Sequence, residues 1–238
     1  MLLAVDIGNT NITLGGYRDD ILIFTARIAT DTKLTADQYA VTIKNILALH
    51  EQDARQIEDC IIASVVPQVG TAVSRAVSKL CEIVPLMIGP GVKTGLNIKI
   101  DNPAQLGADL VVGAVGAMAE YTLPCVIIDM GTASTVSVID ANGCFLGGVI
   151  AAGVRLTLKA LCENTAQLPA IDIEAPRSVI GSNTVDSMKS GLVFGTAAGG
   201  AADGFVGHLH IVVLGVGAHQ GDVALTVMGT GLNADGEV

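Results

Sequence analysis

The sequence predicts a compact α/β protein built from two halves with related chain paths. Composition is the first indication: 50% of the 238 residues are hydrophobic and 15% are charged, which allows a sizeable core and argues against disorder. The second is a repeated pattern, in which each half opens with three consecutive strands and the first strand ends on an aspartate at a turn of small residues. Two such halves that face each other would enclose a cleft with one hairpin tip on each wall.

Charge and residue types argue against several classes of protein. The net charge of −10 argues against a nucleic-acid partner, which requires a basic face. The five cysteines are scattered without a CxxC pair, which is typical of reduced thiols in the cytosol. The N-terminus has no basic region, and the apolar stretch Gly204–Ala218 is too short to span a bilayer. We therefore expect a cytoplasmic protein that binds neither nucleic acid nor a membrane.

The first half, residues 1–115, is expected to alternate strands and helices after its opening hairpin. Apolar residues recur at helical spacing before Leu49, and either Asp31 or Thr35 can cap the start of that helix. The run Cys60–Val66 is apolar throughout, which is typical of a buried parallel strand. The other expected elements are a hairpin at Leu3–Thr13, strands at Ile21–Ile28 and Val84–Ile88, and helices from Pro67 to about Cys81 and from Pro103, after an Asn102 N-cap, to about Tyr121.

The second half, residues 116–238, restarts with three strands. Asn142-Gly143 predicts the hairpin turn between the second and third of them, because both residues tolerate the backbone of such turns. The segment Asn164–Ser182 contains two prolines and few periodic apolar residues, so we expect a surface loop. The remaining elements are strands at Cys125–Asp129, Thr135–Asp140, Cys144–Ile150 and Val223–Met228, and helices at Val154–Cys162 and from Asn183 or Thr184 to about Leu209.

The two hairpins have the residues that phosphate binding requires. Phosphoryl transfer needs donors for phosphate oxygens, a metal ion and a base for the attacking hydroxyl. Gly8 and Gly131 allow backbone N–H groups to approach an anion, while Asp6 would hold Mg²⁺ directly or through water. An ordinary hairpin with a polar turn is the alternative for either hairpin alone, and the repetition favours phosphate binding. The side-chain donors would be Asn9, Thr10, Thr13 and Thr132.

Asp109 is the candidate general base. It follows Gly107-Ala108 near the second turn of the helix expected to start at Pro103. A glycine inside a helix costs about 1 kcal/mol relative to alanine, so Gly107 indicates close packing against the backbone. We expect Asp109 to accept the proton of a substrate hydroxyl, and a solvated helix carboxylate is the alternative.

In its motifs, the sequence resembles the type III pantothenate kinases, which belong to the acetate and sugar kinase/Hsp70/actin superfamily. The resemblance implies two duplicated actin-like (ribonuclease H-like) domains, residues 1–115 and 116–238, each with a mixed five-stranded sheet, around a nucleotide cleft. The motifs cover nearly the whole chain, in the order Asp6-Ile7-Gly8-Asn9-Thr10, Asn102-Pro103, Gly107-Ala108-Asp109, Asp129-Met130-Gly131-Thr132-Ala133, Gly147-Gly148, Thr165-Ala166-Gln167-Leu168-Pro169, Asn183-Thr184 and Ser190-Gly191.

The resemblance also implies an activity, the ATP-dependent phosphorylation of pantothenate to 4'-phosphopantothenate, which is the first step of coenzyme A biosynthesis. Asp109 would accept the proton, and Asp129 would bind a monovalent cation, K⁺ or NH₄⁺. The protein would be a homodimer with pantothenate near the subunit interface. The ATP phosphates, with Mg²⁺, would contact Asp6, Gly8, Asn9, Thr10, Asn11, Thr13 and Thr132, and the pantothenate site would include Ile100, Gly107, Ala108, Leu110 and Thr184.

Two positions of the pantothenate site depart from the family pattern. Ile100 and Leu110 stand where the family usually has Tyr and Arg, so a hydroxyl and a cation are both absent. Loss of a charge-assisted contact can cost about 1.5–3 kcal/mol. The family's Thr-Gly-Gly nucleotide motif also reads Thr230-Gly231-Leu232. Two alternatives therefore stay open, namely a family paralogue with a changed phosphoryl acceptor and a non-catalytic nucleotide-binding regulator.

Overall fold

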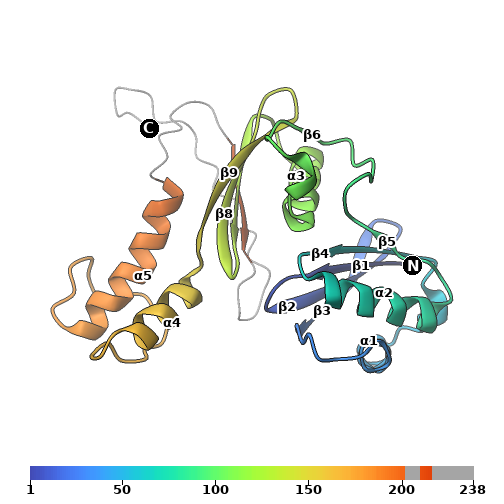
Figure 1. The fold of residues 1–238 in the computed structure, drawn as a ribbon, viewed down its shortest axis with the longest axis horizontal. Helices are drawn as coiled ribbons and strands as arrows, with labels where there is room; N and C mark the ends of the chain where they lie inside the picture. Colours follow the sequence, from blue (N-terminus) through green and yellow to red (C-terminus); the bar gives the residue numbers. More distant parts are fainter. Residues whose placement is uncertain (202–209, 216–238) are drawn as a thin grey trace. The chain divides into compact units, whose positions relative to one another are not determined.

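The computed structural model describes residues 1–201 and 210–215, and the chain divides into two compact units (Figure 1). The first unit contains residues 1–94 and 102–112, and the second contains residues 95–101 and the chain from Gly113 onward. Among the described residues each unit contains one mixed five-stranded sheet, as the family resemblance implies. A division into domains at residues 115 and 116 stays a prediction.

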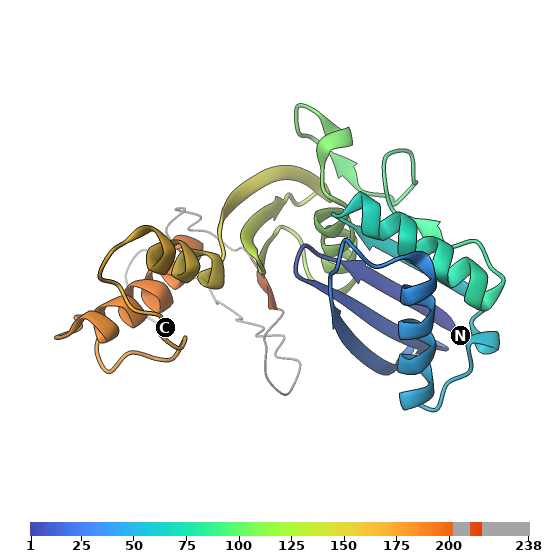
Figure 2. The ribbon, with the colours of Figure 1, turned by 60° about the horizontal axis from the view of Figure 1, so that its bottom comes forward.

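The sheet of the first unit has the strand order β3-β2-β1-β4-β5. The first three strands form an antiparallel meander, and β4 and β5 continue the sheet in parallel to β1. Two helices, α1 and α2, pack on the same face of this sheet (Figure 2). The bounds are β1 Leu2–Ile7, β2 Asn11–Arg18, β3 Ile21–Ala29, α1 Ala36–Leu49, the 3-10 turn η1 Ala54–Gln56, β4 Asp59–Ser64, α2 Pro67–Cys81 and β5 Leu86–Met87.

The core of the first unit lies between this sheet and its two helices. Along β1 the side chains alternate, so Leu3, Val5 and Ile7 are buried in that core while Asp6 is exposed on the opposite face. Helix α1 starts with a capping box formed by Thr35 and Gln38, which confirms Thr35 as the N-cap. The helices contribute Tyr39, Ile43, Ile46, Leu47, Val69, Val73, Ala76 and Val77 to the core.

The sheet of the second unit has the order β10-β7-β8-β9-β6. Its central strands β7, β8 and β9 repeat the antiparallel meander, with β6 and β10 added in parallel at its two edges. Helices α4 and α5 lie together beyond the end of β9 (Figure 1). The bounds are β6 Asn97–Ile98, β7 Cys125–Met130, β8 Ala133–Ile139, β9 Cys144–Ala152, α4 Val154–Asn164, α5 Thr184–Ala201 and β10 His210–Gly215, and helix α3 Ala108–Glu120 begins in the first unit and ends in the second.

The predicted long helix from Pro103 is wrong at its start. A single 3-10 turn, η2 Pro103–Gln105, comes first, and α3 begins only at Ala108. The reason is local: Leu106 has extended backbone angles, which interrupt the helix, and the Asn102 side chain makes no capping hydrogen bond. Asp109 therefore lies in the first turn of a helix and not in its second turn.

Other differences concern short or distant strands. The strand predicted at Val84–Ile88 is reduced to the two residues of β5, and β6 and β10 had not been predicted because they pair with strands far along the chain. Three predictions lie outside the described residues, namely the end of the last helix at residues 202–209, the strand Val223–Met228 and the motif Thr230-Gly231-Leu232. All five cysteines are free thiols. Within residues 1–201 and 210–215, we find no helix long and apolar enough to cross a membrane.

Candidate active site

The turn between β1 and β2 is held closed by the residue that follows β3. Gly8 N–H donates to Asn11 O across the turn (2.9 Å). Thr30 N–H donates to Thr10 O (2.9 Å), and the Thr30 hydroxyl donates to Gly8 O (2.7 Å). The Gly8 N–H is thus used inside the turn, so contacts with an anion fall to the residues after it. Thr30 was missed from the sequence because its role depends on the end of β3 reaching this turn.

The turn between β7 and β8 is closed in the same way. Gly131 N–H donates to Ala133 O (3.1 Å), and Gly153 N–H, immediately after β9, donates to Thr132 O (3.0 Å). A Cβ on Gly153 would lie 2.6 Å from Thr132 O, closer than real Cβ atoms approach a backbone oxygen, so this position requires glycine. In both units the third strand of the meander ends against the first turn. Gly153 was also missed, since the sequence around it has no turn motif.

The strand register places a hydroxyl beside each aspartate. Asp6 pairs directly with Thr13, and Asp129 pairs directly with Thr135. Directly opposed residues on neighbouring strands project to the same face of a sheet. The two hairpins keep this arrangement although their loops differ in length. The loop comprises residues 8–11 in the first hairpin and residues 131–133 in the second. The duplication therefore extends from the chain path to the position of single functional groups.

Asp109 lies at the start of α3, in the same unit as Asp6. Its side chain is half-buried, and its Oδ1 accepts a hydrogen bond from Leu110 N–H (2.8 Å). A Cβ on Gly107 would overlap the Asp109 carboxylate and lie 3.8 Å from Val65 Cγ1. The group that packs closely against Gly107 is therefore Asp109 itself, and glycine keeps this space free for the carboxylate.

Asp6 and Asp109 interact electrostatically. The pKa of Asp6 is raised, first because the surrounding protein removes part of its hydration and second because the Asp109 charge is nearby, while Arg27 opposes both effects. The Asp6 side chain is nevertheless exposed by its accessible surface. A ligand can therefore reach the Asp6 carboxylate, while the protein around it limits its hydration.

Such a carboxylate fits a Mg²⁺ ion whose other ligands come from phosphate and water. Among the described residues no group of three or more His, Cys, Asp or Glu side chains could hold a metal ion. Mg²⁺ is usually bound through one or two carboxylates, substrate phosphates and several waters, and a single carboxylate such as Asp6 fits this mode of binding. A cation at this place would also reduce the repulsion between Asp6 and Asp109.

Asp129 has the surroundings expected of a site for a monovalent cation. The hydroxyl Oγ1 of Thr135, its direct cross-strand neighbour, is buried and has no hydrogen-bond partner among the described residues, and the same holds for Ser134 Oγ. A buried hydroxyl without a partner is costly, and an oxygen ligand for a cation is one way to satisfy it. The residues present therefore fit a cation such as K⁺ beside Asp129.

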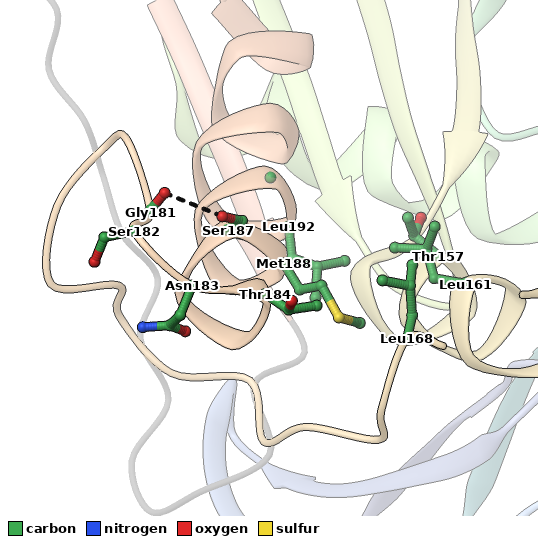
Figure 3. A pocket seen from close by; sticks show the side chains of 11 residues that line it. Thr157, Leu161, Leu168, Gly181, Ser182, Asn183, Thr184, Ser187, Met188 and Leu192 are labelled. Carbon is green, nitrogen blue, oxygen red and sulfur yellow. Dashed lines mark hydrogen bonds between the residues drawn. The ribbon is translucent and has the colours of Figure 1, made fainter. Parts of the chain in front are cut away.

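The residues predicted to bind pantothenate occupy three places. Gly107, Ala108 and Leu110 surround Asp109 at the start of α3, while Ile100 lies against Gly147 in the second unit, where a Cβ on this glycine would be 3.7 Å from Ile100 Cγ2. Thr184 begins α5 and lines a cavity of about 670 Å³ between α4 and α5 (Figure 3). That both hairpins form the walls of one cleft stays a prediction. Other residues around the Thr184 cavity are Thr157, Leu161, Leu168, Met188 and Leu192.

Asn183 fixes the start of α5 and thereby Thr184. Its Oδ1 accepts a hydrogen bond from Asp186 N–H (2.9 Å), and its side-chain amide donates to Asp186 Oδ2 (2.7 Å). The first of these bonds is typical of a helix N-cap, and the second gives the buried Asp186 carboxylate a partner.

The chain is similar to known proteins in sequence and in fold. A family model described as type III pantothenate kinase matches residues 2–206. A type III pantothenate kinase of Halalkalibacterium halodurans is 41% identical over 195 residues, which are 82% of this chain and 77% of the relative.

Two solved structures share the fold. A Campylobacter jejuni protein described as a Baf family transcriptional activator has a TM-score of 0.56 at 19% identity and covers 90% of this chain and 83% of its own. A Sinorhizobium meliloti protein described as a 2-dehydro-3-deoxygalactonokinase has a TM-score of 0.58 at 14% identity, with coverage of 91% and 84%. At these identities the likeness concerns the fold alone, and it confirms the predicted class of an α/β protein with two actin-like halves.

Replacing Asp6 by Asn is expected to raise the melting temperature at pH 7. A carboxyl whose pKa is raised by folding favours the folded state when it is protonated, and this contribution is lost as the pH rises through the raised pKa. At pH 7 the ionised Asp6 therefore opposes folding. The gain in Asp6→Asn should shrink as the pH is lowered towards 3.8, the ordinary pKa of an aspartate.

Thermal unfolding followed by circular dichroism at several pH values measures this difference. Asp59→Asn is the matched control, because it removes an exposed carboxylate at the opposite end of the neighbouring strand β4. A lower melting temperature for Asp6→Asn at pH 7 would contradict the electrostatic account.

Proposed function

The chain belongs to the type III pantothenate kinase family, and from this premise we propose that it transfers the γ-phosphoryl group of ATP to the hydroxyl of pantothenate. The product would be 4'-phosphopantothenate, so the reaction is the first step of coenzyme A biosynthesis. The single observation that carries the proposal is the electrostatic interaction of Asp6 with Asp109 in the first unit. It indicates that the carboxylate proposed to hold Mg²⁺ and the proposed base lie near each other. The 41% identity over 82% of the chain supports pantothenate as the acceptor over a changed acceptor or a non-catalytic regulator.

In this reaction the pantothenate hydroxyl oxygen attacks the γ-phosphorus, the bond to the ADP oxygen breaks, and the hydroxyl proton passes to Asp109. Asp6 would hold Mg²⁺ directly or through water, and Mg²⁺ would supply charge neutralisation. Gly107 leaves the space that the Asp109 carboxylate occupies. The polar groups proposed to bind the phosphates are those of Asn9, Thr10, Asn11, Thr13 and Thr132, with Gly8 shaping the first turn, and Ile100, Gly107, Ala108, Leu110 and Thr184 are proposed to line the pantothenate site.

Replacing Asp109 by Asn is expected to lower kcat by about 10²–10⁴-fold, the range that a positioned general base contributes. Binding of Mg²⁺-ATP should be retained, because the variant keeps Asp6 and the first turn. The measurement is ADP release with Mg²⁺-ATP, K⁺ and pantothenate, together with calorimetric titration of Mg²⁺-ATP.

Glu120→Gln is the matched control for this variant, since Glu120 is an exposed carboxylate at the opposite end of the same helix α3. It should retain wild-type turnover. If wild type binds Mg²⁺-ATP but does not phosphorylate pantothenate, the proposed acceptor is wrong, and if Asp109→Asn turns over normally, the proposed base is wrong.

We propose that a monovalent cation, K⁺ or NH₄⁺, binds at Asp129. The buried hydroxyl of Thr135, the direct cross-strand neighbour of Asp129, supports this assignment, because it has no hydrogen-bond partner among residues 1–201 and 210–215. Turnover by wild type should rise with KCl or NH₄Cl at constant ionic strength, and Asp129→Asn should abolish most of that response. An equal response to K⁺ in wild type and Asp129→Asn would exclude Asp129 as the cation ligand.

We further propose a homodimer. No residue of α4 is buried, and two large apolar side chains of this helix pair are exposed, Leu156 on α4 (45%) and Phe194 on α5 (42%). Exposed apolar side chains of this kind are typical of an interface. Sedimentation equilibrium should give twice the mass of one chain at micromolar concentration. A monomer at concentrations that sustain full activity would contradict the proposal.

A cytoplasmic location is also proposed. Free thiols at all five cysteines support it, because reduced cysteines persist in a reducing compartment. Recovery of the native protein from a periplasmic or membrane fraction would contradict it.

A further inference from the structure

Arg27 lies in one cross-strand row with two residues of the candidate phosphate site. Asp6 on β1 is directly opposite Thr13 on β2, and Thr13 is directly opposite Arg27 on β3. Residues paired in this way project to the same face of the sheet. The irregularity in the β2–β3 register occurs at Gly16/Tyr17, beyond this row, so it does not change the face. The three side chains therefore follow one another across the sheet.

This row lies on the face of the sheet that α1 and α2 do not cover. The neighbours of Thr13 along β2, Ile12 and Leu14, are buried in the core under the two helices, so Thr13 faces the other way. Asp6 and Arg27 are both exposed and Thr13 is half-buried. Figure 2 shows both helices on one side of this sheet. The row is thus available to a ligand that approaches the uncovered face of the first unit.

The guanidinium of Arg27 has no partner of its own in the part of the chain that the structure describes. It forms no hydrogen bond or ion pair with residues 1–201 or 210–215, yet its charge acts on Asp6, two strands away. An arginine presents five N–H donors in a planar fork that matches the oxygens of a phosphate group. Arg27 therefore combines free donors, an exposed position and proximity to the metal-binding carboxylate.

The negative charge near Asp6 also favours a cationic side chain at this site. Asp6 and Asp109 repel each other, and the polyphosphate of ATP would bring further negative charge to the same place. Mg²⁺ offsets only part of this charge. Neutral groups such as the Thr13 hydroxyl donate hydrogen bonds without balancing charge.

We propose that Arg27 is a further ATP-binding residue, which contacts the polyphosphate from β3 in line with Thr13 and Asp6. This inference rests on the proposed function, since it assigns a role in the ATP site of that kinase. Arg27 binds phosphate oxygens through its guanidinium and plays no part in binding the acceptor.

The test is calorimetric titration of Mg²⁺-ATP, without acceptor, into wild type and Arg27→Gln. The expected result is a roughly 10- to 100-fold higher Kd for the variant, the effect of losing a charge-assisted hydrogen bond. The Kd for adenosine, which has no phosphate, should stay unchanged. In turnover assays the KM for ATP should rise, and the KM for pantothenate should not.

Arg18→Gln is the matched control, because it removes the same charge from an exposed arginine at the far end of the β2–β3 hairpin. Its Kd for Mg²⁺-ATP should equal that of wild type. Arg27→Lys, which keeps the charge and loses the planar fork, should bind Mg²⁺-ATP with an affinity between those of wild type and Arg27→Gln. If Arg27→Gln does not fold, Arg27→Lys alone decides the test, and wild-type affinity in that variant overturns the proposal.

The possible failures are distinguishable. A wild-type protein that neither binds Mg²⁺-ATP nor transfers phosphate overturns the proposed function together with this inference. An active wild type and an Arg27→Gln variant of equal Mg²⁺-ATP affinity overturn only the role of Arg27. Equal losses of ATP and adenosine affinity would assign Arg27 to the fold of the first unit and likewise overturn its contact with phosphate.

Discussion

The repulsion between Asp6 and Asp109 is the interaction on which the candidate site depends. The Asp109 charge adds to the loss of hydration at Asp6, and together they raise the pKa of the Asp6 carboxyl, so a cation bound beside Asp6 would reduce this unfavourable interaction. The fold holds both groups in place through backbone constraints. Asp6 is fixed by the ladder of β1, and Asp109 by the start of α3 after the extended residue Leu106. The unfavourable interaction at this site is thus electrostatic, and the backbone holds the two carboxylates in position.

The duplicated meander explains why two turns far apart in sequence have the same construction. In each unit the residue after the third strand, Thr30 or Gly153, donates its N–H to a carbonyl of the first turn. The two units differ in what surrounds the aspartate. Asp6 is exposed near a second carboxylate, whereas Asp129 is paired with Thr135, whose buried hydroxyl has no hydrogen-bond partner within the described part of the chain. The same strand arrangement therefore places two aspartates in different surroundings, which is the basis for proposing a different cation at each.

Local signals in the sequence predict most of this fold, and long-range pairing accounts for most of the errors. The Thr35 cap, the Pro67 helix start and the Asn142-Gly143 turn depend on neighbouring residues, and the structure has all three. Strands β6 and β10 are short or lie far from their partners, so no periodicity identifies them. Within the site, motifs identify Asp6 and Asp109, but Thr30, Gly153 and Arg27 depend on strand register. Register is a property of pairing and cannot be read from a single segment.

The error at the start of α3 concerns the residue proposed as the base. Asn102-Pro103 is a strong helix start, yet the chain forms only a 3-10 turn there and begins the helix at Ala108. A continuous helix would place Asp109 in its interior, where the N–H groups ahead of it are already bonded within the helix. At the actual start, Asp109 lies in the first turn, where the backbone N–H groups are not bonded within the helix. The interruption at Leu106 therefore places the Asp109 carboxylate at a helix start, where its Oδ1 accepts a hydrogen bond from the otherwise unbonded Leu110 N–H.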